Sequence, residues 1–244
     1  MAYNPIIHLL KGIHGRINSG ILSGMQGQQS PQNVAFLREL HREIRKEQVM
    51  YEPLNKLNAV VFDIETTGFF PDKGDVILSI GAIKVDGGII KEEDTFYSLV
   101  FHNEDLSPEL THLTGIRKED LLNAPNLSSV LLQFFEFAKD AVLVAHHANH
   151  EKTFLQHSSW KLFRTPLKHR ILDTSFLFKI ADPDLQLVRL EDLCVYHDIP
   201  VVERHHALGD ARLTAKLWSI YIEKIIQLGI VNMNDLYEAL SKVR

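Results

Sequence analysis

The fold of this chain is decided around residues 59–68, which read Ala-Val-Val-Phe-Asp-Ile-Glu-Thr-Thr-Gly. The apolar run at residues 59–62 is typical of a buried central strand. Because side chains two apart on a strand point to the same face, Asp63 and Glu65 project together. Two adjacent carboxylates resist ionisation unless a cation lies between them, and hard ions such as Mg²⁺ or Mn²⁺ prefer oxygen ligands. The stretch indicates a metal-binding strand end, although taken alone it fits a solvated strand end equally well.

The sequence on either side of this strand predicts a mixed α/β domain. Residues 76–85 and 89–101 form two strand patterns joined by the hairpin turn Asp86-Gly87-Gly88. Further along, apolar runs predict strands over 141–145 and 171–173, and helical periodicity predicts helices over 127–138, 150–158, 189–197 and 207–228. We expect Asn234 to cap a final helix through Lys242. A hairpin followed by strands that alternate with helices indicates a mixed sheet covered by helices.

The N-terminal quarter of the chain differs from the rest. We therefore expect a helical N-terminal extension at 1–56, a main domain at 57–228 and a C-terminal helix at 229–244. Residues 5–22 and 34–49 have helical periodicity, and a Gly/Gln/Ser-rich linker lies between them at 23–29. Seven Lys and Arg against four Glu make residues 1–57 mildly basic. A packing extension with solvated charged faces is favoured over a clamp for nucleic acid.

The bulk composition is that of an ordinary soluble protein. Its 244 residues are 45% hydrophobic and 23% charged, with a net charge of −5. A negative net charge gives no evidence of a basic surface for nucleic acid. It does not exclude one, because metal-binding acids would cancel local basic patches in the total charge. The single cysteine, Cys194, favours a reducing compartment. No apolar stretch approaches the ~20 residues that span a bilayer, so we expect a cytoplasmic protein with no membrane partner.

A second acidic position lies near the C-terminal end of the main domain, in the segment His205-His206-Ala207-Leu208-Gly209-Asp210. We expect His205 in a loop and Asp210 in the first turn of the following helix. Asp210 can then reach a metal ion, while His205 approaches from the loop as a base that activates water. An ordinary loop histidine and an aspartate favoured by the helix dipole would also explain either residue singly.

Three segments together resemble a known family. Asp63-x-Glu65-Thr-Thr-Gly, the segment Leu143-Val144-Ala145-His146 and His205-x-Ala-x-x-Asp210 are similar to the three motifs of the DEDDh (DnaQ-like) 3′→5′ exonucleases. That family includes proofreading subunits and domains of bacterial replicative polymerases. Smaller similarities are Ile80-Gly81-Ala82, Leu113-Thr114-Gly115-Ile116, Ala124-Pro125 and Leu172-Asp173-Thr174. The resemblance covers roughly residues 57–228, which it identifies as an exonuclease domain.

The resemblance implies a fold, a reaction and a set of site residues. It implies a ribonuclease H-like mixed five-stranded sheet flanked by helices, and release of nucleoside 5′-monophosphates from single-stranded DNA ends. Two divalent ions, Mg²⁺ or Mn²⁺, would be held by Asp63, Glu65, Glu151 and Asp210, with Glu65 also holding the ion nearer the nucleophile. His205 would be the general base, since an unperturbed histidine pKa of ~6.5 suits neutral pH. Nucleic acid would be contacted by Thr66, Thr67, Leu113, Thr114 and His146.

The second motif departs from the family pattern. The family reads His-Asn-Ala-x-Phe-Asp, whereas residues 146–151 read His-His-Ala-Asn-His-Glu, so Glu151 takes the place of a metal-binding aspartate. Its extra methylene moves the carboxylate by about one C–C bond, ~1.5 Å. Asp140 and Asp173 are possible substitutes, but Asp173 has its own place in the family pattern. We therefore rank Glu151 first and favour an altered but working site.

Other readings stay open. The substrate could be RNA instead of DNA, and the chain could act alone or serve a DNA polymerase or repair complex. A second reading is a nucleic-acid-binding protein whose catalysis is weakened by Glu151. A third is a zinc peptidase that uses His146, His147, His150 and Glu151. Such a peptidase needs a glutamate directly after the first histidine, and His147 occupies that position.

Overall fold

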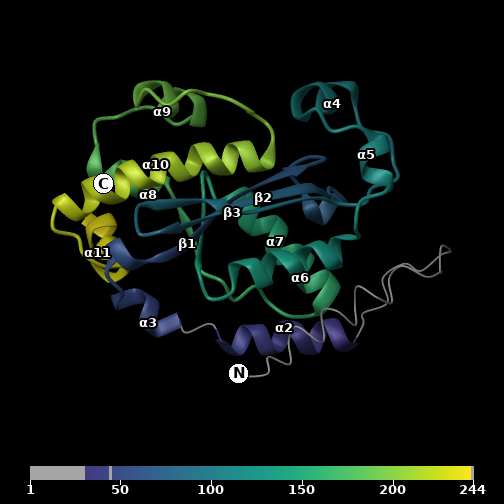
Figure 1. Cartoon of the computed structure of the whole chain (residues 1–244), viewed down its shortest axis with the longest axis horizontal. Helices are drawn as coiled ribbons and strands as arrows, with labels where there is room; N and C mark the ends of the chain where they lie inside the picture. Colours follow the sequence, from purple (N-terminus) through teal and green to yellow (C-terminus); the bar gives the residue numbers. More distant parts are fainter. Residues whose placement is uncertain (1–30, 44–45, 243–244) are drawn as a thin grey trace.

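A five-stranded sheet lies between two layers of helices in the computed structural model, which describes residues 31–43 and 46–242 (Figure 1). The strands are β1 (Asn58–Thr66), β2 (Ile77–Asp86), β3 (Ile89–Leu99), β4 (Val142–Ala145) and β5 (Ile171–Asp173). The helices are α2 (Pro31–Glu43), α3 (Lys46–Tyr51), α4 (Pro108–Thr114), α5 (Lys118–Leu122), α6 (Leu127–Ala138), α7 (Asn149–Phe163), α8 (Ser175–Ala181), α9 (Leu190–Tyr196), α10 (Ala207–Gln227) and α11 (Met233–Lys242). The mixed sheet flanked by helices, as expected from the sequence, is confirmed.

The sheet has the order β3-β2-β1-β4-β5. The hairpin expected at Gly87 pairs β2 with β3, and β2 also runs antiparallel to β1. On the other side, β1, β4 and β5 are parallel. The carboxyl ends of these three strands therefore meet at one edge of the sheet, where ligands commonly bind in α/β folds.

Alternate side chains of β1 enter two different cores. Ala59 and Val61 pack in the core that includes Trp218 of α10. Phe62 and its neighbours two residues away face the core built from α6 and α7. Asp63 continues the α10-facing side, because strand side chains alternate between faces. The same face of β1 that buries apolar groups at its start thus presents acids at its end.

Gly81 of β2 lets α10 lie close to this acidic end. Gly81 pairs with Asp63 on one side and with Tyr97 of β3 on the other. A Cβ on Gly81 would lie 2.1 Å from the backbone nitrogen of Leu208, so no larger residue fits without displacing the helix. The missing side chain therefore brings the first turn of α10 against Asp63.

The described part of the N-terminal segment packs on the domain. Leu37 of α2 is buried in the core that α6 and α7 share, and α3 contacts α11. The N–H of Leu54 donates to the carbonyl of Val231 at 2.8 Å. These contacts agree with a packing extension, although the division at residues 56 and 228 stays a prediction. The helix expected at 5–22 and its linker lie outside the described residues.

Two details differ from the sequence-based expectation. The helix expected over 34–49 begins earlier and extends further, since its described parts are α2 and α3, with residues 44–45 outside the described residues. The cap of α11 is Asn232, whose side-chain oxygen accepts from the N–H of Asp235 at 2.9 Å. The expectation of Asn234 as the cap is wrong, because Asn234 already lies inside the helix. Within the described residues, no helix has the length and apolarity to cross a bilayer.

Candidate active site

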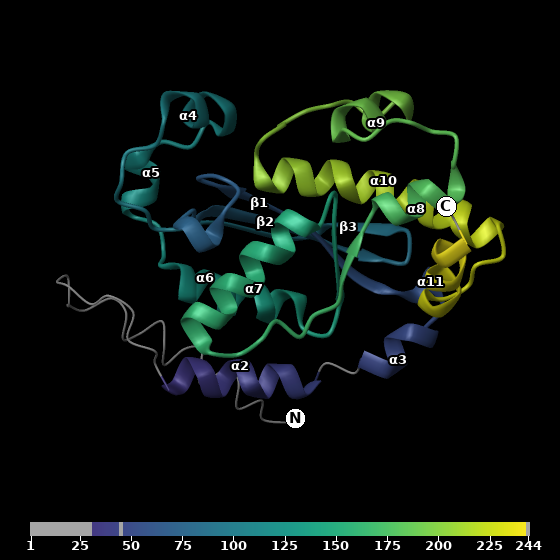
Figure 2. The ribbon, with the colours of Figure 1, turned by 180° about the vertical axis from the view of Figure 1, so that it is seen from behind.

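Three carboxylates meet where β1 ends against the first turn of α10. Asp63 and Glu65 come from β1, and Asp210 comes from α10. One carboxylate oxygen of each lies within 4.8 Å of the other two. Figure 1 shows α4 and α9 on either side of the N-terminal end of α10, and Figure 2 shows the same arrangement from behind. A compact set of oxygen ligands of this kind suits a hard divalent ion.

Glu151 approaches this centre from the helix layer on the other face of the sheet. It lies in the first turn of α7, and only 5% of its surface is exposed. It stands outside the group of three, yet its charge is the second-largest cause of the raised pKa of Asp63. Glu151 is therefore a candidate ligand from the neighbouring helix layer, and its metal-binding role stays a prediction.

Burial and mutual repulsion make these carboxyl groups hard to ionise. Burial, followed by the charge of Asp210, raises the pKa of Glu65 to about 8. Burial also raises the pKa of Glu151 to about 8. The pKa of Asp63 is raised well above its usual range, first by burial and then by its acidic neighbours. A cation among these groups would favour their charged forms.

The donor set fits such a cation. Among the described residues, Oδ1 of Asp210 and Oε2 of Glu151 are buried without a hydrogen-bond partner. A buried polar atom without a partner costs free energy, and metal ions bound at the site would provide partners for these oxygens. Carboxylate oxygens are the ligands that Mg²⁺ and Mn²⁺ prefer.

The raised pKa values predict that stability without divalent ions falls as pH rises. Between pH ~4.5 and ~8 the folded protein binds more protons at Glu65 and Glu151 than the unfolded chain does, so the free energy of unfolding decreases across this window. We expect the melting temperature in chelator to be lower at pH 8.5 than at pH 5.5 by about 10 °C. Glu151→Gln should reduce this fall, and saturating Mn²⁺ should remove most of it. A melting temperature in chelator that is flat or rising over this range would contradict the account.

His205 lies in a tight loop held against α10. Glu203 and His205 both have positive φ angles, of 53° and 60°, which non-glycine residues rarely adopt. The backbone N–H of His205 donates to Oδ2 of Asp210 at 3.2 Å. A Cβ on Gly209 would lie 2.2 Å from the carbonyl oxygen of Glu203, so glycine is needed there. Strained backbone of this kind persists where the surrounding structure fixes it, and it is common at functional sites.

The next residue, His206, holds the start of α10. Its Nδ1 accepts from the N–H of Gly209 at 3.3 Å, which caps the helix. The ring of Tyr97 stacks on the ring of His206, with centroids 4.5 Å apart. Tyr97 is also close enough to Glu65 for that charge to contribute, after burial, to its raised pKa. The pair Tyr97–His206 therefore supports the loop that carries His205.

The turn after β1 is held by its own side chains. The hydroxyl of Thr66 donates to the carbonyl of Gly68 at 2.7 Å. The hydroxyl of Thr67 accepts from the N–H of Val76 at 2.9 Å. Phe69 follows the turn and is 76% exposed. The contact of Thr66 and Thr67 with nucleic acid stays a prediction. Either their backbone groups would make it, or their hydroxyls would break these internal hydrogen bonds to bind the ligand.

Leu113 and Thr114 of α4 differ in accessibility. Leu113 is 50% exposed, whereas Thr114 is buried. The hydroxyl of Thr114 donates to the carbonyl of Leu110 at 2.9 Å and accepts from the N–H of Ile116 at 3.1 Å. Leu113 is thus free to contact a ligand through its side chain, and Thr114 stabilises the end of α4. Their roles toward nucleic acid stay predictions.

His146 and His147 tie a loop to the turn after β4. The ring nitrogens of His146 contact the hydroxyl of Thr174 at 3.0 Å and the carbonyl of Val188 at 2.9 Å. His147 reaches the same carbonyl at 2.8 Å. Burial lowers the pKa of His146 to about 4, so the ring is neutral at neutral pH. A contact of His146 with nucleic acid stays a prediction that would add to this structural role.

The remaining candidate ligands are used elsewhere. Asp173 accepts from the N–H of Ala148 at 3.1 Å and from the N–H of Ser175 at 2.8 Å, so it fixes the turns after β4 and β5. Asp140 is exposed and precedes β4, so it lies at the opposite end of that strand from the site. Neither residue is among the charges that shift the pKa of Asp63, although the charge of Asp173, after burial, contributes to the raised pKa of Glu151. Among residues 31–43 and 46–242, no group of three or more potential metal ligands includes a histidine, so the zinc reading has no support.

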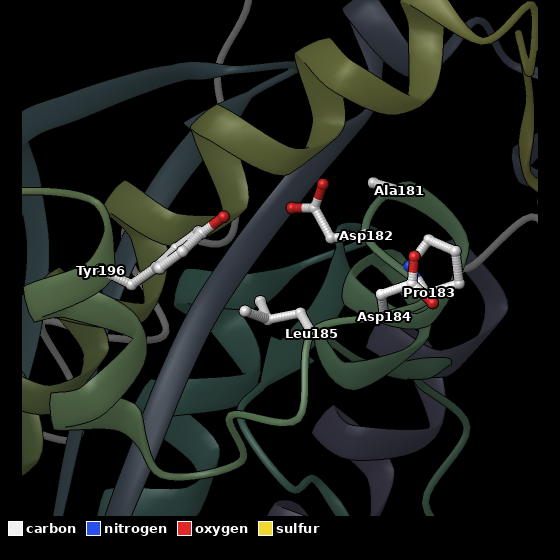
Figure 3. Close-up of a pocket in the computed structure, with 6 residues that line it drawn as sticks. All are labelled: Ala181, Asp182, Pro183, Asp184, Leu185 and Tyr196. Atoms are coloured by element: carbon white, nitrogen blue, oxygen red, sulfur yellow. The ribbon is translucent and has the colours of Figure 1, made fainter.

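A separate cavity of about 410 Å³ lies between the end of α8 and α9. Figure 3 shows its six lining residues, which are Ala181, Asp182, Pro183, Asp184, Leu185 and Tyr196. Its acid Asp182 is paired with Lys224 at 2.7 Å; burial alone would raise the pKa of Asp182, but hydrogen bonds and positive charge, mainly from Lys224, lower it overall. The cavity contains none of the carboxylates described above, so it is not part of the candidate site.

Comparison with known proteins agrees with the geometry of the site. The model of the exonuclease family of RNase T type matches residues 60–218. The chain belongs to the exonuclease family. The DEDDh (DnaQ-like) resemblance expected from the three motifs is confirmed, and with it the ribonuclease H-like fold.

Sequence relatives of this exonuclease domain are much longer proteins. The chain is 36% identical over 181 residues to the DNA polymerase III PolC-type of Caldanaerobacter subterraneus subsp. tengcongensis, which covers 74% of the chain and 13% of the relative. Identity to the DNA polymerase III PolC-type of Thermotoga maritima is 32% over 177 residues, again 13% of the relative. The chain thus spans about an eighth of the length of these relatives.

Solved structures share the fold of this exonuclease domain. The nuclease domain of 3′hExo, a DEDDh family member bound to rAMP, has a TM-score of 0.60 at 18% identity over 72% of the chain and 96% of that structure. Escherichia coli Exonuclease I in complex with a dT13 oligonucleotide has a TM-score of 0.57 at 14% identity over 71% of the chain and 42% of that structure. At these identities the likeness concerns the fold alone.

Sequence reasoning missed three residues that line or brace the exonuclease site. Tyr97 could have been found from the register of the predicted hairpin, because it lies in one row with Gly81 and Asp63. Phe69 follows the first motif directly and is exposed, but no pattern distinguishes it from an ordinary loop residue. Arg204 precedes His205 and forms an ion pair with Asp210. Its positive charge directly before the motif that ends at Asp210 was the available signal.

Proposed function

We propose that this chain is a metal-dependent 3′→5′ exonuclease that releases nucleoside 5′-monophosphates from single-stranded DNA ends. The observation that supports this most strongly is the group Asp63, Glu65 and Asp210, with its oxygens within 4.8 Å, beside the loop of His205. Membership of the exonuclease family gives this group its chemistry. The buried, unpartnered oxygens of Asp210 and Glu151 favour a working centre over a binding protein with lost catalysis.

Asp63, Glu65, Glu151 and Asp210 would hold two divalent ions, Mg²⁺ or Mn²⁺. Such ions, when bound, supply an activated water and neutralise charge that develops on the phosphate. His205 takes the proton from the attacking water, and its backbone bond to Asp210 keeps it beside the ligands. Glu65 orients the nucleophile. The side chains of Phe69, whose ring also contacts that of His150, and of Leu113 are exposed and would pack on the terminal base.

DNA is favoured over RNA because the sequence relatives are DNA polymerase III proteins. A polymerase or repair complex is the corresponding partner, and a cytoplasmic location stays a prediction. The test is a time course on 5′-labelled single-stranded DNA and RNA of the same sequence, each with Mg²⁺ or Mn²⁺. We expect faster shortening of DNA. Faster shortening of RNA would overturn the DNA assignment and support an RNA-directed exonuclease.

The longer ligand Glu151 predicts an unusual ion preference. Mg²⁺ requires near-ideal octahedral geometry at ~2.0–2.1 Å, and a carboxylate displaced by a methylene disturbs it more than it disturbs the larger Mn²⁺. We expect hydrolysis to be faster with Mn²⁺ than with Mg²⁺, and Glu151→Asp to narrow this difference. The measurement is the hydrolysis rate of the wild type and of Glu151→Asp, each with Mn²⁺ and with Mg²⁺. Equal wild-type rates together with a crippled Glu151→Asp would show that the surrounding backbone has adapted to the glutamate.

A further inference from the structure

Arg204 joins the metal ligands to a helix outside the site. Its guanidinium forms an ion pair with Asp210 of α10 and contacts Oε2 of Glu191 at 3.1 Å. Glu191 lies in the first turn of α9 and also pairs with Arg189. Arg204 is mostly buried, with 23% of its side-chain surface exposed, so its charge acts in a poorly solvated place.

The guanidinium is a positive charge placed against the cluster of acids. It pairs with Asp210, and one carboxylate oxygen of Asp210 lies within 4.8 Å of an oxygen of Asp63 and of an oxygen of Glu65. Only 6% of the side-chain surface of Asp210 is exposed, so this ion pair is poorly solvated. One fixed positive charge thus partly neutralises a cluster of acids that repel one another.

The guanidinium of Arg204 and a divalent ion would share the carboxylate of Asp210. Its Oδ2 accepts from Arg204 and from the N–H of His205, while its Oδ1 is buried without a partner. A divalent ion on this carboxylate would lie next to the guanidinium. Repulsion between a monovalent and a divalent cation a few ångströms apart is worth on the order of a tenfold change in affinity, even at the dielectric constant of water.

We propose that Arg204 is an internal competitor of divalent ions for Asp210, and that Glu191 retains the guanidinium when ions bind. The inference rests on the metal centre of the proposed function. It makes Arg204 a positioning residue that sets ion affinity. When no ion is bound, the charge of Arg204 partly neutralises the acids. When ions bind, the same charge makes their binding weaker.

The test is calorimetric titration of the full chain with Mn²⁺, without substrate, at one pH. Arg204→Gln should bind Mn²⁺ about tenfold more tightly than wild type, because the competing charge is gone. Glu191→Gln should bind it more weakly, because Arg204 loses its second partner and stays on Asp210. Arg204→Lys keeps the charge and should stay close to wild type. Arg212→Gln is the matched control and should stay close to wild type, because it also removes an arginine but one that pairs with Glu203.

Melting temperatures give a second readout. Arg204→Gln should melt below wild type in chelator, because the acids lose their counter-charge, and should gain more than wild type on addition of Mn²⁺. Mn²⁺ affinity of Arg204→Gln that is unchanged or weaker than wild type would overturn the competition. A wild-type protein that binds no Mn²⁺ would instead overturn the metal centre itself, and this inference with it.

Discussion

Asp63→Asn is expected to reduce hydrolysis by at least about 10³-fold with either ion, which corresponds to ~4 kcal/mol of transition-state stabilisation. Asp63 forms a compact group with Glu65 and Asp210, so the substitution removes one of three clustered carboxylate ligands. The asparagine keeps the shape of the side chain but removes its charge. Initial rates on a 5′-labelled oligonucleotide measure the effect.

The same variant should fold at least as stably as wild type in chelator at pH 8. The raised pKa of Asp63 means that its ionised form is disfavoured in the folded protein, so removing the charge relieves repulsion. The exposed Asp140 gives a matched control, and Asp140→Asn should change neither rate nor melting temperature. Near-normal hydrolysis by Asp63→Asn would refute the metal-ligand role.

His205→Ala is expected to lower kcat by roughly 10²–10⁴-fold with little change in KM, because a general base acts in the transition state. The loop geometry supports this role, since the positive φ of His205 and its N–H bond to Asp210 fix the residue beside the ligands. Single-turnover rates at saturating substrate separate the chemical step from binding. A loss that appears in KM alone would assign His205 to substrate binding.

His206→Ala is the comparison that isolates chemistry from loop structure. It removes the cap of α10 and the stacking of Tyr97, but it leaves the proposed base. We expect the free energy of unfolding to fall by ~1 kcal/mol, as is typical of a lost helix cap, and the melting temperature to fall with it. The loss of rate should be smaller than in His205→Ala. An equal loss of kcat in the two variants would mean that loop order, and not proton transfer, explains the effect of His205→Ala.

The sequence was most informative where local pattern and tertiary structure agree. The apolar run before Asp63 and the Gly87 turn predict the central strand and the hairpin, because a buried strand and a tight turn each depend on few neighbouring residues. The order of the motifs predicts that Asp63 and Asp210 come together. Gly81, within one of the smaller similarities, is explained only by the helix that lies against it.

Features that depend on contacts distant in sequence could not be predicted. The bonds of His146 involve Thr174 and Val188, which no periodicity places beside it. The pairing of Arg204 with Glu191 depends on how α9 lies beside α10. The cap at Asn232 was missed because two asparagines stand within three residues of each other, and either satisfies the pattern. In each case the deciding information is spatial.

The most direct test of the central claim is the direction and product of cleavage. One oligonucleotide is labelled in two preparations, at the 5′ end and at the 3′-terminal nucleotide, and digested with Mn²⁺. We predict that the 3′ label is released at once as a nucleoside 5′-monophosphate, while the 5′ label passes through strands that shorten one nucleotide at a time. Chelator should stop both. Release of the 5′ label first, internal cuts, or digestion that continues in chelator would contradict a metal-dependent 3′→5′ exonuclease.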